Sequence, residues 1–334
     1  MQYSGELPVS TYVIVDLQNL AMRVRYGVRA PDFNAQVGLA MHTIFTSIKK
    51  VWNDQKGSHL VVCLESRSWR RDFYPPYKAH RRVAAGQRTV DEMEEDKTFF
   101  EALDDFIQFA QDRTNATVLK APHAEADDLI ARWIQLHPTS NHVIVSTDSD
   151  FQQLLATNVK IYDGISALLY TIDGIYDKDG NLAFNKKGEE LPKPNPNWLL
   201  FEKCIRGDAS DNVMSAFPGV RKKRMQEAFE NRESQGYSWN NLMLSTWTDH
   251  NGDEIRVRDA YERNRILVDL TAQPPELIQS WDTAIQSAVN QPKKSQVGIA
   301  LLKFAAQWGL VRIEKTAADY SMCFSSEYSG SLKQ

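Results

Sequence analysis

The sequence predicts an α/β fold with a parallel central sheet, followed by a mostly helical region. Short β-branched runs alternate with segments whose apolar residues recur every three or four positions, a pattern typical of parallel strands joined by helices. The clearest strands, Tyr12–Asp16, Leu60–Leu64 and His142–Ser146, are largely apolar, as expected for strands covered on both faces. Right-handed crossovers would bring their carboxyl ends to one edge of the sheet.

Two further strands and two long helices extend this pattern. We expect strands at Ala116–Lys120 and Val159–Tyr162, and a helix over Asn34–Trp52. A second long helix begins after Thr89, because Glu92 follows at the spacing of a capping box. These elements place the core within residues 11–196.

The composition changes after residue 163. Asp179-Gly180 predicts a β-hairpin within an insertion at 163–196, and the proline-rich stretch 192–196 predicts an exposed linker. Residues 197–316 then form a predicted helical domain, and the Ser-rich tail 317–334 is expected to be loosely held. Its expected helices are Trp198–Arg206, Arg221–Asn231, Val257–Leu270, Ala284–Val289 and Gly298–Trp308.

Bulk composition excludes several classes of protein. The chain of 334 residues is 42% hydrophobic and 25% charged, which is ordinary for a globular protein. No apolar run approaches the ~20 residues that a membrane span needs. The cysteines, Cys63, Cys204 and Cys323, are too dispersed to predict a zinc site or a disulfide framework. Residues 1–10 lack a secretion signal, so we expect a cytoplasmic protein without a membrane partner.

The distribution of charge indicates a phosphate-bearing partner, although the net charge is −4. Residues 65–88 contain seven Lys or Arg against two acids, whereas 89–105 contain one Lys against eight acids. A second basic cluster is formed by Arg221, Lys222, Lys223 and Arg224. Local charge, rather than the sum, attracts a nucleic-acid backbone.

Acidic residues end three predicted strands. Asp16, Glu65 and Asp148 stand at carboxyl ends, where open α/β sheets bind their ligands. Other carboxylates follow nearby in the sequence: Glu125, Asp127, Asp128, Asp150, Asp208 and Asp211. No His or Cys accompanies them, and an all-oxygen set suits Mg²⁺ or Mn²⁺ rather than zinc. Two such ions can promote phosphodiester cleavage. Salt bridges to Lys or Arg are the alternative, but the strands carry no compensating base.

The basic segment interleaves cations with aromatic rings. Cations neutralise phosphates and rings stack on unpaired bases, so this segment is the predicted substrate surface. Its cations are Arg70, Arg71, Lys78, Arg81 and Arg82, and its rings include Trp69, Phe73, Tyr74 and Tyr77. We expect at least one of Trp69, Phe73 and Tyr74 to pack in the core beneath a loop.

Taken in order, these motifs resemble the 5′-nuclease, or flap-endonuclease, superfamily. The motifs are a strand ending in Asp16, then LE ending at Glu65, RRDFYPPYK with AHR, EADD, STDSDF and RGDASDN. Within that superfamily the chain is most similar to the ribonuclease H (5′-3′ exonuclease) group of T-even-like bacteriophages. The similarity extends from about residue 12 to 231.

The resemblance implies a PIN-like α/β core with a helical arch at about 66–98 and a helix-hairpin-helix-type module in the helical domain. It implies a Mg²⁺-dependent 5′→3′ exonuclease and flap endonuclease with RNase H activity, which removes RNA primers and 5′ flaps in DNA replication. Mn²⁺ would substitute. The substrates would be DNA with a 5′ flap or nick and RNA–DNA hybrids, cut by a monomer in the host cytoplasm if the chain is phage-encoded. A single-stranded-DNA-binding protein or a polymerase clamp would be a partner.

The resemblance also assigns roles to residues. Asp16, Glu65, Glu125 and either Asp127 or Asp128 would serve a first metal site. A second would use or border Asp148, Asp150, Asp208 and Asp211. Lys78 would contact the scissile phosphate, with Arg81 helping and Tyr77 stacking on a base.

Two positions depart from the family's pattern. Glu65 stands where Asp is usual, which extends the carboxylate by one methylene. The glycine-rich hairpin is replaced by Phe217–Arg221, with one glycine lost, so whether a monovalent cation binds there stays open. Two other functions would share the acids: a PIN-type single-strand ribonuclease, which would need neither the arch nor RGDASDN, and a non-catalytic DNA-binding relative, against which the near-complete acid set argues.

Overall fold

The structure is a computed structural model that describes residues 9–28, 32–249 and 251–333. Residues 1–8, on which part of the prediction about a secretion signal depends, lie outside the described residues. Within the described ranges, no helix is both long and apolar enough to span a bilayer.

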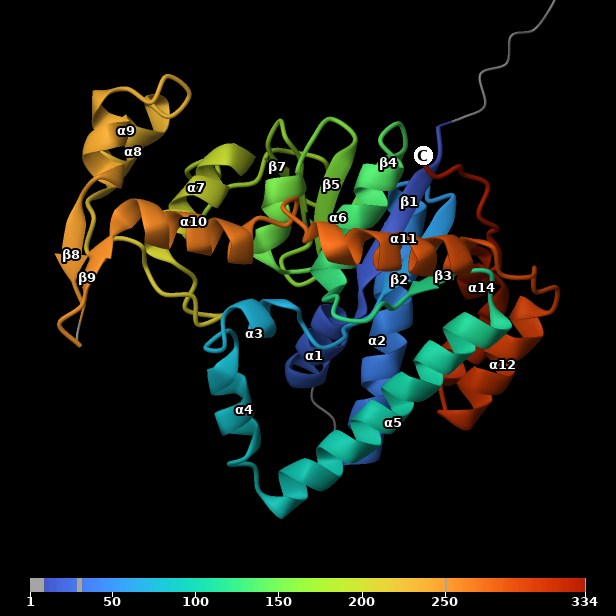
Figure 1. Cartoon of the computed structure of the whole chain (residues 1–334). Helices are drawn as coiled ribbons and strands as arrows, with labels where there is room; N and C mark the ends of the chain where they lie inside the picture. The colour runs from blue at the N-terminus through green and yellow to red at the C-terminus, as the bar shows by residue number, and fades with distance from the viewer. Residues whose placement is uncertain (1–8, 29–31, 250, 334) are drawn as a thin grey trace, which may run out of the picture.

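The centre of the fold is a seven-stranded sheet in the order β3-β2-β1-β4-β5-β6-β7 (Figure 1). The first five strands in this order are parallel, as predicted, and the last two pair antiparallel at one edge. The strands are β1 Thr11–Asp16, β2 His59–Cys63, β3 Thr117–Leu119, β4 Asn141–Val145, β5 Val159–Asp163, β6 Leu168–Tyr170 and β7 Ile175–Tyr176. β6 and β7 belong to the predicted insertion, where Gly180 adopts a positive φ in the turn that follows β7.

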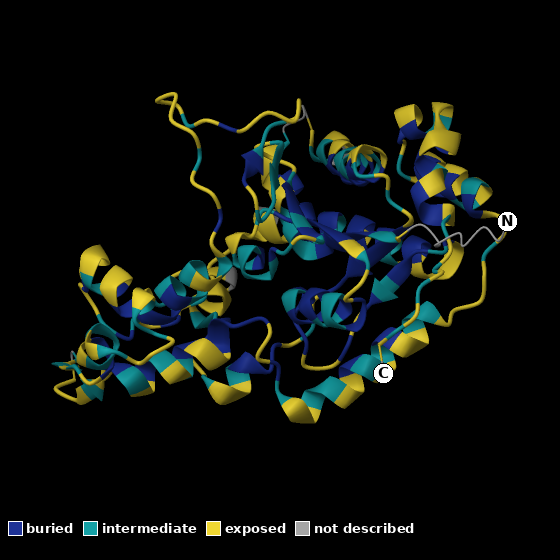
Figure 2. Cartoon of the chain, turned by 90° about the horizontal axis from the view of Figure 1, so that it is seen from above, coloured by how far each residue is buried: buried dark blue, intermediate teal, exposed yellow. Residues whose placement is uncertain are grey.

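Each strand buries alternate residues on opposite faces of the sheet. In β1, Val13 and Val15 belong to one hydrophobic cluster, whereas Tyr12 and Ile14 belong to the other. Helices α2 (Phe33–Asp54) and α5 (Val90–Arg113) contribute to the first cluster, and α6 (Ala126–Leu136) to the second. Figure 2 shows the resulting buried layer along the sheet. A short helix, α1 (Leu17–Gly27), follows β1 directly.

The basic segment forms one side of an arch that projects below the sheet in Figure 1. Two short helices, α3 (Arg70–Phe73) and α4 (Ala79–Ala85), lead from the core to the first turn of α5. The predicted capping box is present, with Thr89 and Glu92 bonded to each other's backbone amides. Trp69 is buried at the base of the arch, as expected for at least one of its rings.

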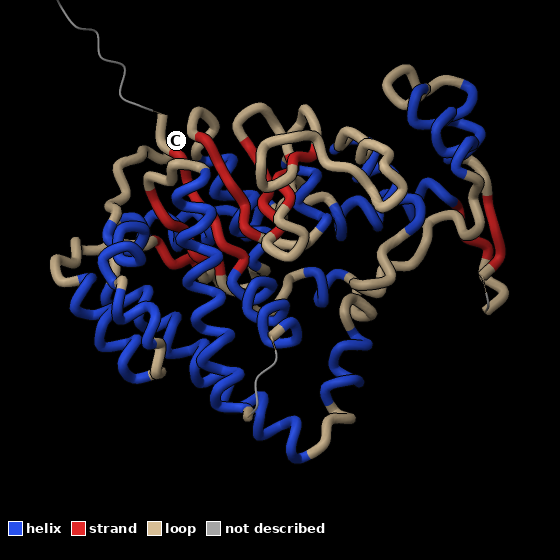
Figure 3. The backbone as a smooth tube through the Cα atoms, turned by 180° about the vertical axis from the view of Figure 1, so that it is seen from behind, coloured by secondary structure: helices blue, strands red, loops and turns tan. Residues whose placement is uncertain are grey.

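A second lobe lies beyond the β7 edge of the sheet, where Figure 3 shows its two-stranded ribbon. It has its own small core, which includes Phe201, Ile205, Met225 and Leu242. Its elements are α7 Pro196–Arg206, α8 Lys222–Glu230, α9 Tyr237–Met243, β8 Thr246–Thr248, β9 Glu254–Arg256 and α10 Val257–Val268.

The chain then returns to the sheet, so the predicted helical domain 197–316 is wrong in its last third. Helix α11 (Pro275–Val289) packs into the cluster that contains α6, and α12 (Val297–Gln307) and α13 (Val311–Lys315) join the cluster that contains α2 and α5. The second lobe therefore ends near the end of α10, and the following helices complete the core.

The prediction of a loosely held tail is also wrong. Residues Ala317–Ser325 form α14, whose Tyr320, Cys323 and Phe324 are buried against α2 and α5. Further on, the Tyr328 hydroxyl lies 2.7 Å from His137 Nε2, and the Lys333 amide donates to the Leu136 carbonyl at 2.9 Å. The prediction relied on the serine content and overlooked apolar residues that recur at helical spacing.

Replacing Phe324 tests this packing. Its ring lies 5.4 Å from that of Phe45 and 5.6 Å from that of Phe109, centroid to centroid. Because truncation leaves a cavity, Phe324→Ala should lower the free energy of unfolding by about 3–5 kcal/mol in urea titrations. Met322→Ala on the exposed face of the same helix is the control and should change it little. Equal effects of the two substitutions would contradict the packing.

Candidate metal centre

The three strand-end acids lie on neighbouring strands, because β1 is flanked by β2 and β4. Asp16 ends β1 and caps α1 by accepting the Asn19 amide at 3.2 Å. Its other oxygen accepts the Ser146 hydroxyl at 3.1 Å. Asp148 follows β4 and caps the short 3₁₀ helix η1 (Ser149–Leu154). Glu65 lies just beyond β2. The parallel order of the strands thus brings these carboxylates to one edge, as predicted.

Glu125 connects the sheet edge to the arch. One of its oxygens, Oε2, accepts the Ser68 hydroxyl at 2.7 Å, Arg70 Nη1 at 3.0 Å and the Tyr77 hydroxyl at 3.0 Å. The other, Oε1, accepts Lys78 Nζ at 2.5 Å. Glu125 is also the N-cap of α6. Burial opposes its charge, but Lys78 and Arg70 outweigh burial and lower the pKa of Glu125 to about 2.

Asp127 and Asp128 differ in what compensates them. Asp128 is fully buried, and its oxygens lie 3.0 Å and 2.9 Å from Arg70 Nη1 and Nη2. It also accepts the Glu125 amide at 2.9 Å, which completes the cap of α6. Asp127 is half-buried and, within the described part of the chain, accepts a hydrogen bond from the Asp128 amide alone, at 2.8 Å. Desolvation first, and then the charge of Asp128, raise the pKa of Asp127.

A second group of acids surrounds Lys203, which reaches in from α7. Its ammonium contacts Asp150 on η1 and lies 2.8 Å from Asp208 Oδ2. Asp208 Oδ1 accepts the amide and the hydroxyl of Ser210 at 2.8 Å and 2.6 Å. Burial raises the pKa of Asp150 to about 6 in spite of Lys203. For Asp208 the hydrogen bonds from Lys203 and Ser210 overcome burial and lower the pKa.

Asp211 attaches the second lobe to the arch. Its side chain accepts the Tyr77 hydroxyl at 2.9 Å and Arg81 Nη2 at 2.8 Å, and it lies 3.6 Å from Lys78 Nζ. The Lys78 amide donates to the Asp211 carbonyl at 2.8 Å, and Lys78 itself has a φ of 51°. The start of α4 is therefore fixed to Glu125 on one side and to Asp211 on the other.

The structure places the predicted acids along one edge in separate groups, and their side-chain donors are all oxygens. Atoms of Glu125, Asp127 and Asp128 lie within 4.8 Å of one another. Desolvation, joined by the charges of Glu125 and Asp16, raises the pKa of Glu65 to about 8, although this side chain reaches solvent at the edge. Desolvation likewise raises the pKa of Asp16 to about 6. Such carboxylates retain protons where negative charge exceeds the cations at hand, so the residues fit divalent metal.

Two predicted nucleic-acid contacts are wrong. Arg70 is 1% exposed, holds Glu125 and Asp128, and donates Nε to the Leu267 carbonyl at 2.8 Å, so it has no surface for a phosphate. Tyr77 is 2% exposed, and its buried ring cannot stack on a base. In both cases the polar group of the side chain points into the protein, where it bonds to carboxylates.

The other predicted cations differ in exposure. Arg224 donates to Asn241 and to Ser245 Oγ at 2.7 Å, and its guanidinium lies over the Phe217 ring. Arg71 is half-buried at the base of the arch. Arg81, Arg82, Arg221, Lys222 and Lys223 are exposed.

Sequence reasoning missed the cation between the second group of acids. Lys203 lies 53 residues from Asp150, and nothing local in the sequence marks it as the partner of an acid. Asn19 was also missed: its Oδ1 accepts the Thr147 amide at 3.1 Å and so ties the β4 loop to α1. Only the position of Lys203, one turn before the end of α7, would have suggested its contact with Asp150.

Comparison with known proteins identifies the family. Residues 11–180, half of the chain, match the family described as 5′-3′ exonuclease, N-terminal resolvase-like domain. The chain belongs to this family. The matched segment contains the whole sheet, the arch and seven of the acids predicted as ligands, Asp16, Glu65, Glu125, Asp127, Asp128, Asp148 and Asp150.

Relatives of the family include larger and smaller proteins. The chain is 27% identical to DNA polymerase I of Mycobacterium tuberculosis over 291 residues, which cover 81% of this chain but only 29% of that protein. It is 26% identical to the flap endonuclease of Escherichia phage T5 over 215 residues, 64% of this chain and 67% of that one. A structure of T5 D15 protein with metal ions superposes with a TM-score of 0.58 at 21% identity, covering 83% of this chain and 99% of that one. It supports the fold.

Arg70→Met tests the inward role of Arg70. The substitution leaves two buried carboxylates without their shared cation, so it should lower the free energy of unfolding by about 3–5 kcal/mol in urea titrations. Arg82→Met, on the exposed face of the arch, is the matched control and should leave stability unchanged. If the Arg70→Met protein were as stable as wild type but bound DNA more weakly, Arg70 would belong to the substrate surface, and the inward role would be refuted.

The raised pKa of Glu65 predicts how stability depends on pH without metal. Between its ordinary pKa of 4.5 and about 8, the folded protein holds a proton that the unfolded chain has released. The metal-free protein should therefore lose stability as the pH rises through this window. Asp16 and Asp150, whose pKa values are about 6, add to the dependence only below that pH, so Glu65→Gln should flatten it across the window and most clearly between about pH 6 and 8. Thermal unfolding in EDTA measures it, and an unchanged slope would refute it.

Proposed function

We propose that this protein is a Mg²⁺-dependent 5′→3′ exonuclease and flap endonuclease that also removes RNA from RNA–DNA hybrids. The observation that carries the proposal is that Lys78 of the arch pairs with Glu125 beside the strand-end acids Asp16 and Glu65, on which its charge also acts. Family membership supports the 5′-nuclease reading. The arch and the hydrogen bond from the Lys78 amide to the Asp211 carbonyl favour a 5′ nuclease over a short PIN-type ribonuclease.

The acids divide into two ligand groups in this proposal. Asp16, Glu65, Glu125 and Asp127 would hold one Mg²⁺ or Mn²⁺. Asp127 is preferred to Asp128 because Arg70 already occupies both oxygens of Asp128. The second ion would lie among Asp148, Asp150, Asp208 and Asp211. Divalent ions bound there would supply Lewis acidity for phosphodiester hydrolysis.

Lys78 is the proposed catalytic cation. Burial opposes its charge, but Glu125 and Asp211 outweigh burial and raise the pKa of its ammonium, so it stays protonated at neutral pH. Its positive charge can therefore bind the scissile phosphate while Glu125 and Asp211 keep its position. Arg81, exposed beside Asp211, would bind the same phosphate or its neighbour.

The proposed DNA surface extends from the arch to the second lobe. Arg71 and Arg82 would bind the single-stranded side, and Arg221, Lys222 and Lys223 would bind duplex phosphates at the start of α8. Gly219, with a φ of 71°, lies in the preceding turn, where a monovalent cation would bind if backbone carbonyls converge around DNA. We further propose that the protein acts as a monomer in the cytoplasm, on 5′ flaps, nicks and hybrids met in replication.

The proposal is tested with a labelled 5′-flapped duplex and an RNA–DNA hybrid, each incubated with Mg²⁺, Mn²⁺ or EDTA. We expect cleavage from the 5′ side only with a divalent ion. Absence of metal-dependent cleavage of both substrates would refute the proposal. Cleavage confined to single-stranded RNA would instead favour the ribonuclease.

Asp148→Asn tests the second ligand group. Loss of one ligand charge should slow cleavage by at least about 100-fold, because metal supplies several kcal/mol of transition-state stabilisation. DNA binding should persist or tighten, since repulsion of the phosphates falls. Asp104→Asn, on the exposed face of α5, is the matched control and should cleave normally. Single-turnover cleavage and fluorescence anisotropy separate the two effects.

A further inference from the structure

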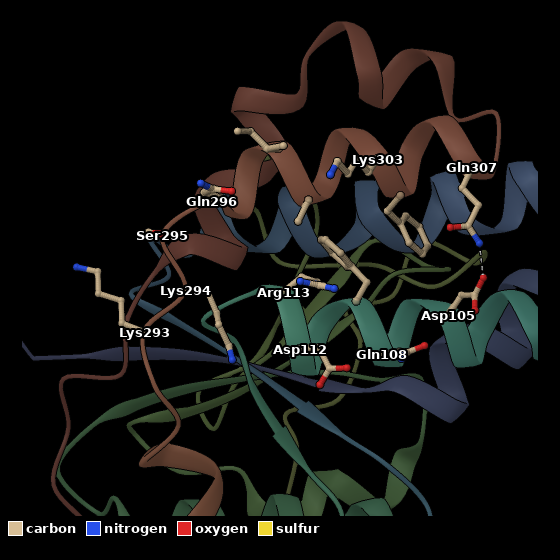
Figure 4. A pocket seen from close by; sticks show the side chains of 14 residues that line it. Asp105, Gln108, Asp112, Arg113, Lys293, Lys294, Ser295, Gln296, Lys303 and Gln307 are labelled. Carbon is tan, nitrogen blue, oxygen red and sulfur yellow. Dashed lines mark hydrogen bonds between the residues drawn. The ribbon is translucent and has the colours of Figure 1, made fainter.

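A groove lies between the C-terminal half of α5 and helix α12, apart from the metal centre and the arch (Figure 4). It has a volume of about 600 Å³. None of the residues that line it is a proposed metal ligand or an arch cation, and none belongs to the second lobe. The proposed nuclease reaction therefore makes no use of this groove.

The floor of the groove is apolar. Phe109 from α5 and Phe304 from α12 form its base, and each is 5% exposed. Ala300, one helical turn before Phe304, is too small to fill the space above the rings. Ile299 stands at the side and is 53% exposed. One apolar side chain of a ligand could cover these groups, and this contact would remove apolar surface of both from water.

The rim of the groove carries positive charge that the chain does not neutralise. Figure 4 shows Arg113 on α5 and Lys303 on the facing helix α12, with Lys294 on the loop that leads from α11 into α12. Among the described residues, no carboxylate lies within ion-pair distance of Arg113, Lys294 or Lys303. An anionic ligand would complement this positive charge.

The acids near the groove do not cancel this charge. Asp105 accepts Gln307 Nε2 at 2.6 Å, a bond that closes one end of the groove. Lys293 pairs with Glu327 at 2.5 Å, and in Figure 4 its side chain extends away from the others. Asp112 is the second acid of the lining, and Asp105 keeps its charge because Gln307 is a neutral donor. Among the described residues, three cations without an ion pair thus face two acids across an apolar floor.

We propose that this groove binds an acidic peptide segment of a partner protein, with one apolar side chain on the Phe109–Phe304 floor. Carboxylates of the peptide pair with Arg113, Lys294 and Lys303. A nucleic-acid backbone would satisfy the cations, but it has no aliphatic side chain to cover Phe109, Ala300 and Ile299. Surface ion pairs each contribute only a few-fold in affinity, so the apolar contact and the charges are both needed.

The test uses the intact protein and a labelled ten-residue peptide in which aspartates flank a single central leucine. Fluorescence anisotropy should show saturable binding that weakens with added salt. Arg113→Glu and Lys303→Glu should each weaken binding by about three- to tenfold, and Ile299→Ser by a similar factor. Lys186→Glu, an exposed charge reversal far from the groove in sequence, is the matched control and should bind as wild type.

Two altered peptides separate charge from apolar contact. Replacing the aspartates with lysines should abolish binding, and replacing the leucine with serine should weaken it. Cleavage of the flapped duplex should be unchanged in all groove variants, which separates this proposal from the nuclease assignment. Equal affinity for the acidic and lysine peptides would overturn the proposal. So would groove variants that bind the peptide normally but lose affinity for a plain DNA duplex, since the occupant would then be nucleic acid.

Discussion

The carboxylate of Glu125 is the interaction on which the arrangement of this protein depends. It ends the loop before α6, accepts hydrogen bonds from Ser68, Arg70 and Tyr77, and pairs with Lys78. Burying a carboxylate is costly unless it is fully paired, and here the pairing requires the base of the arch to be in place. The sheet edge, the arch and, through Tyr77 and Asp211, the second lobe are thereby held in one geometry.

The same requirement explains how negative charge is distributed around the edge. Arg70 and Lys203 hold individual acids permanently, whereas Glu65 and Asp127 have no such cation bonded to them and respond with a raised pKa. Glu65 and Asp127 would therefore gain most from a divalent ion, whereas the other proposed ligands Glu125, Asp150 and Asp208 already pair with a cation of the chain.

Much of this could be predicted from the sequence. The apolar strands and their terminal acids identified the sheet and its active edge, because parallel order forces the carboxyl ends together. The burial of Arg70 could not be predicted, because nothing in the neighbouring sequence distinguishes it from the exposed cations of the same basic segment. Lys203 meets Asp150 only through the tertiary fold. The tail was misjudged from its serines, although Tyr320, Cys323 and Phe324 repeat at the spacing of a buried helix.

The return of α12 and α14 to the sheet has a consequence for how the core is completed. These helices cover the face of β1 and β2 that carries Val13, Val15, Leu60 and Val62. Helices α2 and α5 pack in the same cluster, so α12 and α14, which follow the acidic edge in the sequence, complete a layer that the earlier helices begin. A chain that lacks α12 and α14 would leave the apolar side chains that these two helices cover exposed to water. The core of the sheet thus depends on segments more than 100 residues beyond its last strand.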